Sequence, residues 1–300
     1  MSELTRRVLF AVVAAPLGIW ILLAGGGPLA ALLAVASALA AWEFFRLARA
    51  AGASPLGDVG TALAGLVPIA VHAHFLDVVR LRPSHAAIVL LAILATMIWA
   101  RGVRGRPMTA AAVTVLGVVY TGGLLSFAYS LRYHDTVRYY DALPDAGARL
   151  AGVAVSPGGV LLLMPVLLTW ASDIGGYVVG RAVGGRKLIP AVSPSKTVAG
   201  AIGGLVASIV VAWLAVRLLL RPVAQLAFSP LGTMVFGVVI SVAAQVGDLF
   251  ESLLKREAGA KDSSTLIPGH GGVLDRFDSL FFALPTAQLL ADWLLIPAPR

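Results

Sequence analysis

Acidic side chains gather in one stretch near the carboxyl-terminal end of the chain, between residues 247 and 278. Asp248, Glu251, Asp262, Asp275 and Asp278 are among them. Asp275 and Asp278 lie three residues apart, so on a helix their side chains would share one face. Carboxylate oxygens are the hard ligands that Mg²⁺ takes in proteins, usually one or two of them together with substrate phosphates and water. The stretch therefore indicates a metal-assisted reaction on a phosphate group.

The same stretch carries basic side chains and a glycine turn. They are Lys255, Arg256, Lys261 and Arg276, with Pro268-Gly269-His270-Gly271-Gly272 among them. Glycines let the backbone approach a ligand closely and expose its N–H groups, and a helix that opens at Leu274 would add partial positive charge. Each feature alone has a plainer interpretation: topology-setting charges, a tight turn, or an Asp275–Arg276 salt bridge. Their combination within one loop favours phosphoryl transfer.

A second group of polar residues lies between Trp170 and Gly200. Asp173 falls inside an apolar segment, and an ionisable side chain at membrane depth is costly enough to indicate function by default. After it come Arg181, Arg186 and Lys187, and then Ser193-Pro194-Ser195-Lys196-Thr197. Hydroxyl groups beside a lysine suit phosphate binding, although the spacing is not that of a Walker A loop. The alternatives are that the glycines at 175, 176 and 180 only permit close helix packing, and that Ser195 or Thr197 only caps a helix.

The composition indicates that membrane helices hold these residues. Of the 300 residues, 59% are hydrophobic and 13% are charged, whereas a soluble domain carries about 25% charged residues. A bilayer core of roughly 30 Å needs about 20 apolar residues per helix. We therefore expect an all-α, polytopic integral membrane protein with about nine transmembrane helices, near 8–24, 28–46, 60–79, 85–100, 108–130, 158–180, 199–220, 230–250 and 278–297. The fourth span is short and the second carries Glu43 near its end, so eight or ten spans are also compatible with the sequence.

The distribution of positive charge predicts the orientation of the chain. With the N-terminus in the cytoplasm, 15 of the 23 Lys and Arg residues lie on the cytoplasmic side and 8 lie outside. Basic residues are in excess in short cytoplasmic loops, so we expect a cytoplasmic N-terminus and cytoplasmic loops at 181–197 and 251–276. The net charge of +8 then reflects topology and contact with anionic lipid or phosphate. No basic run with interleaved aromatic residues occurs, so we expect no nucleic-acid partner.

The chain divides by chemistry into two parts. Residues 1–150 are expected to form N-terminal transmembrane helices, and residues 151–300 a C-terminal transmembrane catalytic region with the two cytoplasmic loops. The sequence contains no cysteine, which excludes disulfides, thiolate metal sites and cysteine nucleophiles.

Over about 165–280 the chain resembles the phosphatidate cytidylyltransferases, also called CDP-diacylglycerol synthases. Their C-terminal signature combines a serine, Lys-Arg, Lys-Asp, a Pro/Gly-x-His-Gly-Gly turn and Asp-Arg-x-Asp. In this sequence it reads Ser252, Lys255-Arg256, Lys261-Asp262, Pro268-Gly269-His270-Gly271-Gly272 and Asp275-Arg276-x-Asp278. The upstream block of the family is matched by Asp173, Tyr177, Gly180-Arg181 and Ser193-Pro194-Ser195-Lys196-Thr197. One departure is Val198-Ala199-Gly200, where the family commonly has Trp-Glu-Gly, and it weakens any acidic role at that position.

The resemblance implies a reaction and a set of roles. CTP and phosphatidic acid would give CDP-diacylglycerol and pyrophosphate with Mg²⁺, and a second metal is compatible with it. Asp248 and Asp275 would be the metal ligands, with Asp278 and Asp173 in support and His270 at a phosphate. Substrates would be bound by Tyr177, Arg181, Lys187, Ser193, Ser195, Lys196, Ser252, Lys255, Arg256, Lys261, Gly271, Gly272 and Arg276. The resemblance also implies a homodimer in a bacterial plasma membrane, with CTP arriving from the cytoplasm and phosphatidic acid lying among the membrane lipids.

Two other classes of membrane protein share some of these features. A CDP-alcohol phosphotransferase would carry an Asp-Gly-x2-Ala-Arg motif, which the sequence lacks. A transporter or permease would show internal repeats and paired broken helices, and no convincing repeat is visible. Incorporation of radiolabelled CTP into lipid separates both classes from the synthase.

Overall fold

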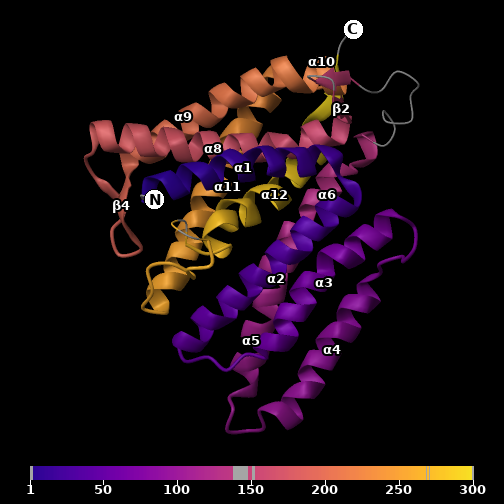
Figure 1. Ribbon diagram of the computed structural model, residues 1–300, viewed down its shortest axis with the longest axis vertical. Coiled ribbons are helices and arrows are strands. Elements are labelled where there is room, and N and C mark those ends of the chain that lie inside the picture. Colours follow the sequence, from indigo (N-terminus) through magenta and orange to yellow (C-terminus); the bar gives the residue numbers. More distant parts are fainter. Residues whose placement is uncertain (1–2, 138–147, 151–152, 268, 270, 299–300) are drawn as a thin grey trace. The chain divides into compact units, whose positions relative to one another are not determined.

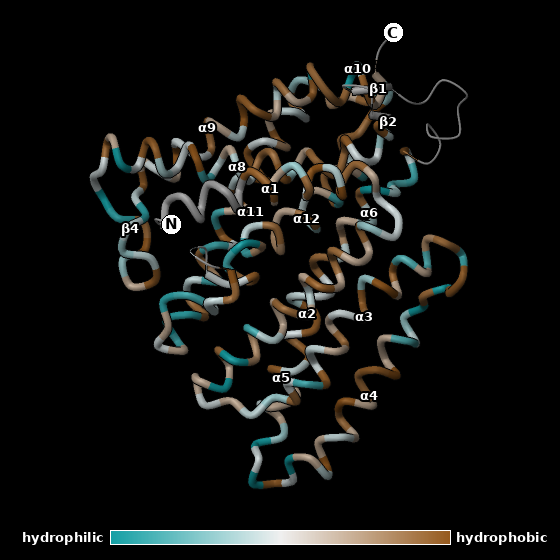
Figure 2. Tube along the Cα trace, in the orientation of Figure 1, coloured by the Kyte–Doolittle hydropathy of each residue, from teal (hydrophilic) through white to brown (hydrophobic). Residues whose placement is uncertain are grey.

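A computed structural model describes residues 3–137, 148–150, 153–267, 269 and 271–298 of the chain. In the described part the fold is predominantly helical, with three short strand pairs (Figure 1). Figure 2 shows apolar residues along most of the helix lengths and polar residues concentrated at the loops. Seven of the helices described are long and apolar enough to cross a membrane: Gly26–Ala50, Gly57–Phe75, Pro83–Ala100, Pro107–Val137, Pro157–Val183, Val198–Ala224 and Pro230–Glu257.

These seven helices coincide with seven of the expected spans, and the all-α membrane fold is confirmed to that extent. The other two expected spans fall on α1 (Glu3–Ala24) and α12 (Leu274–Leu294). Both are continuous helices of 22 and 21 residues. α12 is the less apolar of the two, and it carries four charged residues, Asp275, Arg276, Asp278 and Asp292.

The described helices form two compact units, of which the first comprises Met1–Leu9, Gly26–Ser126 and Leu254–Phe277. Its helices are α2 (Gly26–Ala50), α3 (Gly57–Phe75), α4 (Pro83–Ala100), α5 (Pro107–Gly117) and the π-helical turn η1 (Val118–Gly123). α2 packs against α3 and η1, and Ser37 Oγ on α2 donates a hydrogen bond to the carbonyl of Thr121, at 3.2 Å. The buried ring of Phe45 fills the space beside Gly60 and Gly117, where a Cβ would overlap it. α2 is therefore a central, tightly held element of this unit.

The second unit comprises Phe10–Gly25, Phe127–Leu253 and Asp278–Arg300. Its helices are most of α1, α6 (Phe127–Arg132), α8 (Pro157–Val183), α9 (Val198–Ala215), η2 (Val216–Leu220), α10 (Arg221–Ala224), most of α11 (Pro230–Glu257) and most of α12. α8 and α9 pack closely against each other and run side by side in Figure 1.

The glycines of α8 and α9 account for this close pairing. On α8, a Cβ on Gly175 would lie 2.8 Å from the carbonyl oxygen of Gly203, and one on Gly180 would lie 3.3 Å from Gly200 Cα. On α9, a Cβ on Gly200 would lie 2.7 Å from the carbonyl oxygen of Gly176. Small residues let membrane helices approach backbone to backbone. The packing interpretation of the α8 glycines is thus confirmed, and their packing sets the position of the two segments that carry Asp173 and Lys196.

A short antiparallel hairpin joins α8 to α9. It consists of β3 (Lys187–Ile189) and β4 (Ser193–Thr197), with Lys187 opposite Thr197 and Ile189 opposite Ser193. Thr197 is the N-cap of α9, and its side chain accepts a hydrogen bond from Gly200 N at 3.0 Å. The capping interpretation is therefore confirmed for Thr197. The other two strand pairs are β1 (Ala148–Leu150) with β2 (Val153–Val155), and β5 (Leu226–Phe228) with β6 (Leu295–Pro297).

Candidate active site

A cavity of about 530 Å³ lies in the second unit, among α8, the β3–β4 hairpin, the start of α9 and α11. Small-molecule sites typically enclose about 300–1,000 Å³. Seven of the predicted site residues line it: Asp173, Tyr177, Arg181, Lys187, Ser195, Lys196 and Asp248. The fold thus brings the upstream block of the sequence to Asp248, which belongs to the C-terminal stretch.

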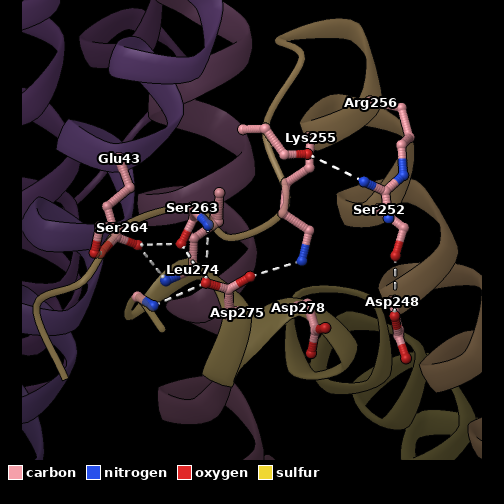
Figure 3. A network of polar contacts seen from close by, with 12 residues as sticks. Glu43, Asp248, Ser252, Lys255, Arg256, Ser263, Ser264, Leu274, Asp275 and Asp278 are labelled. Atoms are coloured by element: carbon pink, nitrogen blue, oxygen red, sulfur yellow. Dashed lines mark hydrogen bonds and ion pairs between the residues drawn. The ribbon is translucent and has the colours of Figure 1, made fainter. Parts of the chain in front are cut away.

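Charges of both signs face this cavity. Lys196 Nζ lies 2.6 Å from Asp248 Oδ2, and the two side chains are 27% and 31% exposed. Ser252 lies one helical turn beyond Asp248 on α11, and its hydroxyl donates to Asp248 Oδ1 at 3.4 Å (Figure 3). Two carboxylates and three cations therefore line one space, a combination suited to a bound metal and phosphate groups.

Two of the basic side chains are held by neighbours on the cavity wall. Arg181 Nη1 donates to the hydroxyl of Tyr177 at 2.7 Å, and its guanidinium carbon lies 6.0 Å from the centre of the tyrosine ring. Lys187 Nζ lies 3.5 Å from the carbonyl oxygen of Ser195. These contacts set the direction of exposed cations before any ligand arrives.

Polar residues that the sequence analysis passed over support the floor of the cavity. Ser172 and Ser241 join α8 to α11 through their hydroxyl oxygens, at 2.8 Å. Gln245 lines the cavity, and its amide nitrogen donates to Ser241 Oγ at 3.1 Å and to the carbonyl of Ala201 at 3.2 Å. Hydrophilic residues inside apolar helices were the available signal, but nothing in the sequence shows that three separate helices bring them together.

In the first unit, Asp275 accepts four hydrogen bonds (Figure 3). Its Oδ2 accepts from Ser263 N at 3.0 Å, Ser263 Oγ at 2.7 Å and Gly272 N at 2.8 Å. Its Oδ1 accepts from Lys255 Nζ at 2.7 Å, and the two side chains are only 13% and 7% exposed. A buried charge-assisted hydrogen bond is a strong one, so Lys255 does more than set topology.

Glu43 of α2 belongs to the same hydrogen-bonded cluster as Asp275. From the sequence alone it is only a charged residue near the end of an expected span. Its side chain is fully buried. Its carboxylate accepts from the hydroxyls of Ser263 and Ser264 and from the backbone N–H groups of Val273 and Leu274. The general rule that intramembrane charges indicate function could have singled it out, as it did Asp173.

The helix predicted to open at Leu274 is present as α12, but its N-terminus does not offer its N–H groups to a phosphate. The first N–H groups donate to Glu43 instead, at 3.0 Å from Val273 and 2.6 Å from Leu274. A carboxylate at a helix N-terminus is stabilised by the helix dipole just as a phosphate would be. The protein's own carboxylate therefore occupies the anion site that the sequence assigns to substrate.

The glycines of the turn are explained in part by packing. Gly271 has a φ of +81°, which only glycine adopts readily. A Cβ on Gly272 would overlap Ser263 Oγ and both oxygens of Glu43. These contacts account for the two glycines without a ligand, and a substrate role for them stays a prediction.

The remaining predicted residues lie in several settings. Arg256, Lys261 and Arg276 are exposed, and Arg256 Nη1 donates to the carbonyl of Ala260 at 3.2 Å. Asp278 accepts from Ser279 N at 2.6 Å. Ser193 is buried in β4. His270 and Pro268 lie outside the residues that the structure describes.

The chain is similar to known proteins over nearly its whole length. The family model described as the cytidylyltransferase family matches residues 5–294. The chain belongs to the cytidylyltransferase family. A phosphatidate cytidylyltransferase of Bacillus subtilis is 29% identical over 291 residues, which cover 97% of this chain and 98% of that protein.

Two further relatives match the chain over about half of their own length. Both are phosphatidate cytidylyltransferases. The Haemophilus influenzae protein is 47% identical over 128 residues, or 43% of this chain and 44% of that protein. The Staphylococcus aureus protein is 42% identical over 140 residues, or 45% of this chain and 50% of that protein. Both are more similar over their shorter matches than the Bacillus protein is over nearly the full length.

The carboxylate oxygens described above are of the ligand type that Mg²⁺ takes in proteins. Among the residues that the structure describes, no group of three or more His, Asp or Glu side chains converges to hold a metal. Mg²⁺ does not need such a cage, because it completes its shell with water and substrate phosphates. Asp248, partly exposed on the wall of the cavity that Asp173 also lines, meets this requirement directly. Asp275 would meet it through Oδ1, in exchange for Lys255 Nζ.

Proposed function

We propose that the protein is a phosphatidate cytidylyltransferase, which transfers CMP from CTP to phosphatidic acid and releases pyrophosphate. The product, CDP-diacylglycerol, would enter phospholipid biosynthesis. The observation that carries the proposal is the cavity of the second unit, where Asp173 and Asp248 face Arg181, Lys187 and Lys196. Membership of the cytidylyltransferase family over nearly the whole chain supports it.

The chemistry of the reaction suits such a cavity. The attacking group is a phosphate monoester, whose second pKa is about 6, so it is already anionic and needs no strong general base. The barrier lies in bringing two anions together and in expelling pyrophosphate. Fixed cations reduce that barrier by positioning the reactants and by stabilising charge in the transition state. Arg181, Lys187 and Lys196 would do this for phosphate oxygens in the cavity.

Mg²⁺ belongs to the proposal as the cofactor, with Asp248 and Asp275 as the proposed ligands and Asp173 and Asp278 as proposed supporting residues. When bound, it would neutralise charge on phosphate oxygens and assist pyrophosphate as a leaving group. The structure supports the choice of Asp248 by its exposure on the cavity wall. A second metal ion would be compatible with the number of carboxylates.

The proposal includes the setting of the enzyme. Nine membrane crossings, with α1 and α12 added to the seven apolar helices, would place the N-terminus and the hairpin β3–β4 on the cytoplasmic face of a bacterial plasma membrane, where CTP is available. The basic residues of the hairpin and of the end of α11 favour this orientation. Because the chain has no cysteine, single cysteines placed at Ala258 and at Asp77 can be labelled in spheroplasts with an impermeant maleimide. We expect protection at Ala258 and labelling at Asp77, and the reverse pattern would contradict the orientation.

A homodimer is the proposed assembly. Light scattering of the purified protein in detergent, with the detergent mass subtracted, tests it. A mass near twice the 31.0 kDa of the chain would support the dimer, and a mass near that of one chain would contradict it.

The test of the reaction uses purified protein in detergent, radiolabelled CTP and phosphatidic acid. We expect labelled CDP-diacylglycerol with Mg²⁺ and none after chelation with EDTA. Asp248→Asn and Asp275→Asn should both abolish product, while Glu257→Gln, an exposed acid in the last turn of α11, should leave it unchanged. No product from monodisperse wild-type protein, across several lipid acceptors and nucleotides, would refute the proposed function.

A further inference from the structure

Glu43 is the one fully buried acid that joins α2 to the loop before α12 in the described part of the first unit. We propose that Glu43 is a positioning residue of the reaction, which holds residues 263–264 and 272–274 so that Asp275 and Lys255 keep their geometry. The inference rests on the proposed function and adds a residue from the N-terminal half of the chain to its machinery.

The hydrogen bonds of Glu43 connect two separate parts of the loop. Oε1 accepts from Ser264 Oγ and from Val273 N, and Oε2 accepts from Ser263 Oγ at 3.0 Å and from Leu274 N at 2.6 Å. Each oxygen therefore binds one hydroxyl and one backbone N–H. All four donors are uncharged, so the carboxylate is stabilised by hydrogen bonds and by the N-terminal dipole of α12.

This arrangement is linked directly to Asp275. Ser263 Oγ lies between two carboxylates, 3.0 Å from Glu43 Oε2 and 2.7 Å from Asp275 Oδ2, so the two acceptors share its one hydroxyl proton. Gly272 donates its N–H to Asp275 and has no space for a Cβ against Glu43. A shift of Glu43 therefore moves two of the three donors that hold Asp275 Oδ2.

The same helix holds the loop at another point. Arg46 lies one turn along α2 from Glu43, and its guanidinium donates to the carbonyl of Ser263. Glu43 thus binds the hydroxyl of Ser263 while Arg46 binds the backbone of the same residue. The buried ring of Phe45 anchors α2 in the core of the first unit. Because α2 is held in this way, Glu43 and Arg46 can keep the loop around Asp275 in one position.

Glu43→Gln is the informative substitution because it keeps the shape of the side chain. The amide nitrogen would face one hydroxyl, which can turn and accept, and one backbone N–H, which cannot. One of the N–H groups at the start of α12 would lose its acceptor, and the loop would shift. A displacement of about 1 Å at a reacting group can cost on the order of 10²-fold in rate. We expect kcat to fall by about 10²-fold while KM for CTP changes less than about threefold, because Glu43 itself touches no substrate.

The experiment measures kcat and KM per folded molecule, on the monodisperse fraction, for wild type, Glu43→Gln, Ser264→Ala and the control Glu257→Gln. Ser264→Ala removes one of the four donors to Glu43 and also the acceptor of Leu266 N. We expect kcat about tenfold below wild type and a melting midpoint lowered by a few degrees. Glu257→Gln should match wild type.

The outcomes separate this inference from the proposed function. A folded Glu43→Gln variant with kcat within threefold of wild type would overturn the positioning role, since a merely structural role lowers stability but not the rate per folded molecule. If Glu43→Gln does not fold, a wild-type kcat in Ser264→Ala overturns the inference and a reduced kcat supports it. No product from wild type would refute the proposed function and this inference with it, whereas equal rates in wild type and variants would refute the inference alone.

Discussion

The crossing of α8 and α9 gives a sharp prediction, because Gly200 separates two backbones. A Cβ at this position would lie 2.7 Å from the carbonyl oxygen of Gly176, whereas close C–H···O contacts have C···O distances of about 3.3–3.6 Å. In Gly200→Ala the helices would have to separate by at least about 0.6 Å. Overpacking of this kind costs roughly 1–3 kcal/mol.

A matched control removes the effect of helix propensity. Gly27 lies in the first turn of α2, as Gly200 does in α9, and nothing lies within 4 Å of the position that its Cβ would take. Both Gly→Ala substitutions gain up to about 1 kcal/mol from better helix formation, so the difference between them isolates the steric cost. At roughly 2–4 °C per kcal/mol, we expect Gly200→Ala to melt several degrees below Gly27→Ala.

Thermal unfolding in detergent, followed by tryptophan fluorescence, measures this difference, and the CTP incorporation assay measures its consequence. Because Gly200 lies just after Lys196 and Thr197, we expect kcat in Gly200→Ala to fall roughly tenfold, while Gly27→Ala remains at the wild-type rate. Equal melting midpoints and equal rates in the two variants would refute the close backbone crossing.

Three further substitutions test separate contacts. Thr197→Val should lower stability by about 1 kcal/mol because Gly200 N loses its cap, and Thr197→Ser should restore it; a Val variant as stable as wild type would contradict the capping role. Lys255→Met leaves a buried Asp275 without its cation. We therefore expect the free energy of unfolding to fall by about 3 kcal/mol or more, with partial rescue by Lys255→Arg. An unchanged melting midpoint would contradict a stabilising Lys255–Asp275 ion pair. Arg101→Ala removes hydrogen bonds to two carbonyls ahead of α3. It should lower the melting midpoint by a few degrees without changing KM for CTP, and an unchanged melting midpoint would contradict the stabilising role of these two hydrogen bonds.

Much of the cavity could be predicted from the sequence because its residues belong to short local motifs. The segment from Asp173 to Lys196 contributes most of the charged lining, and its spacing is visible in the chain itself. The seven apolar helices follow from residue hydropathy and length alone, for the same reason. Local pattern also suggested the cap at Thr197, because a hydroxyl before an apolar helix is a frequent helix start.

The role of Glu43 could not be derived in this way. Its partners, Ser263 and Leu274, lie 220 and 231 residues away in the sequence, and no local pattern indicates which helix meets that loop. The same limit applies to the start of α12, where pattern predicts an anion at the helix N-terminus but does not show that the protein supplies it. The sequence correctly predicts a negative charge at the N-terminus of α12, but it does not show that Glu43, and not a substrate phosphate, supplies it.

The two predicted metal-ligand aspartates differ in a way that bears on how each one acts. Each pairs with a lysine in its own unit, Asp248 with Lys196 and Asp275 with Lys255. Asp248 is about one third exposed on a cavity wall, so an arriving phosphate can take Lys196 and leave the carboxylate to a cation at little structural cost. Asp275 is almost enclosed and accepts four hydrogen bonds, so any exchange there must be accompanied by rearrangement of the loop that Glu43 holds. We therefore expect Asp248 to exchange its lysine for a cation more readily than Asp275 does.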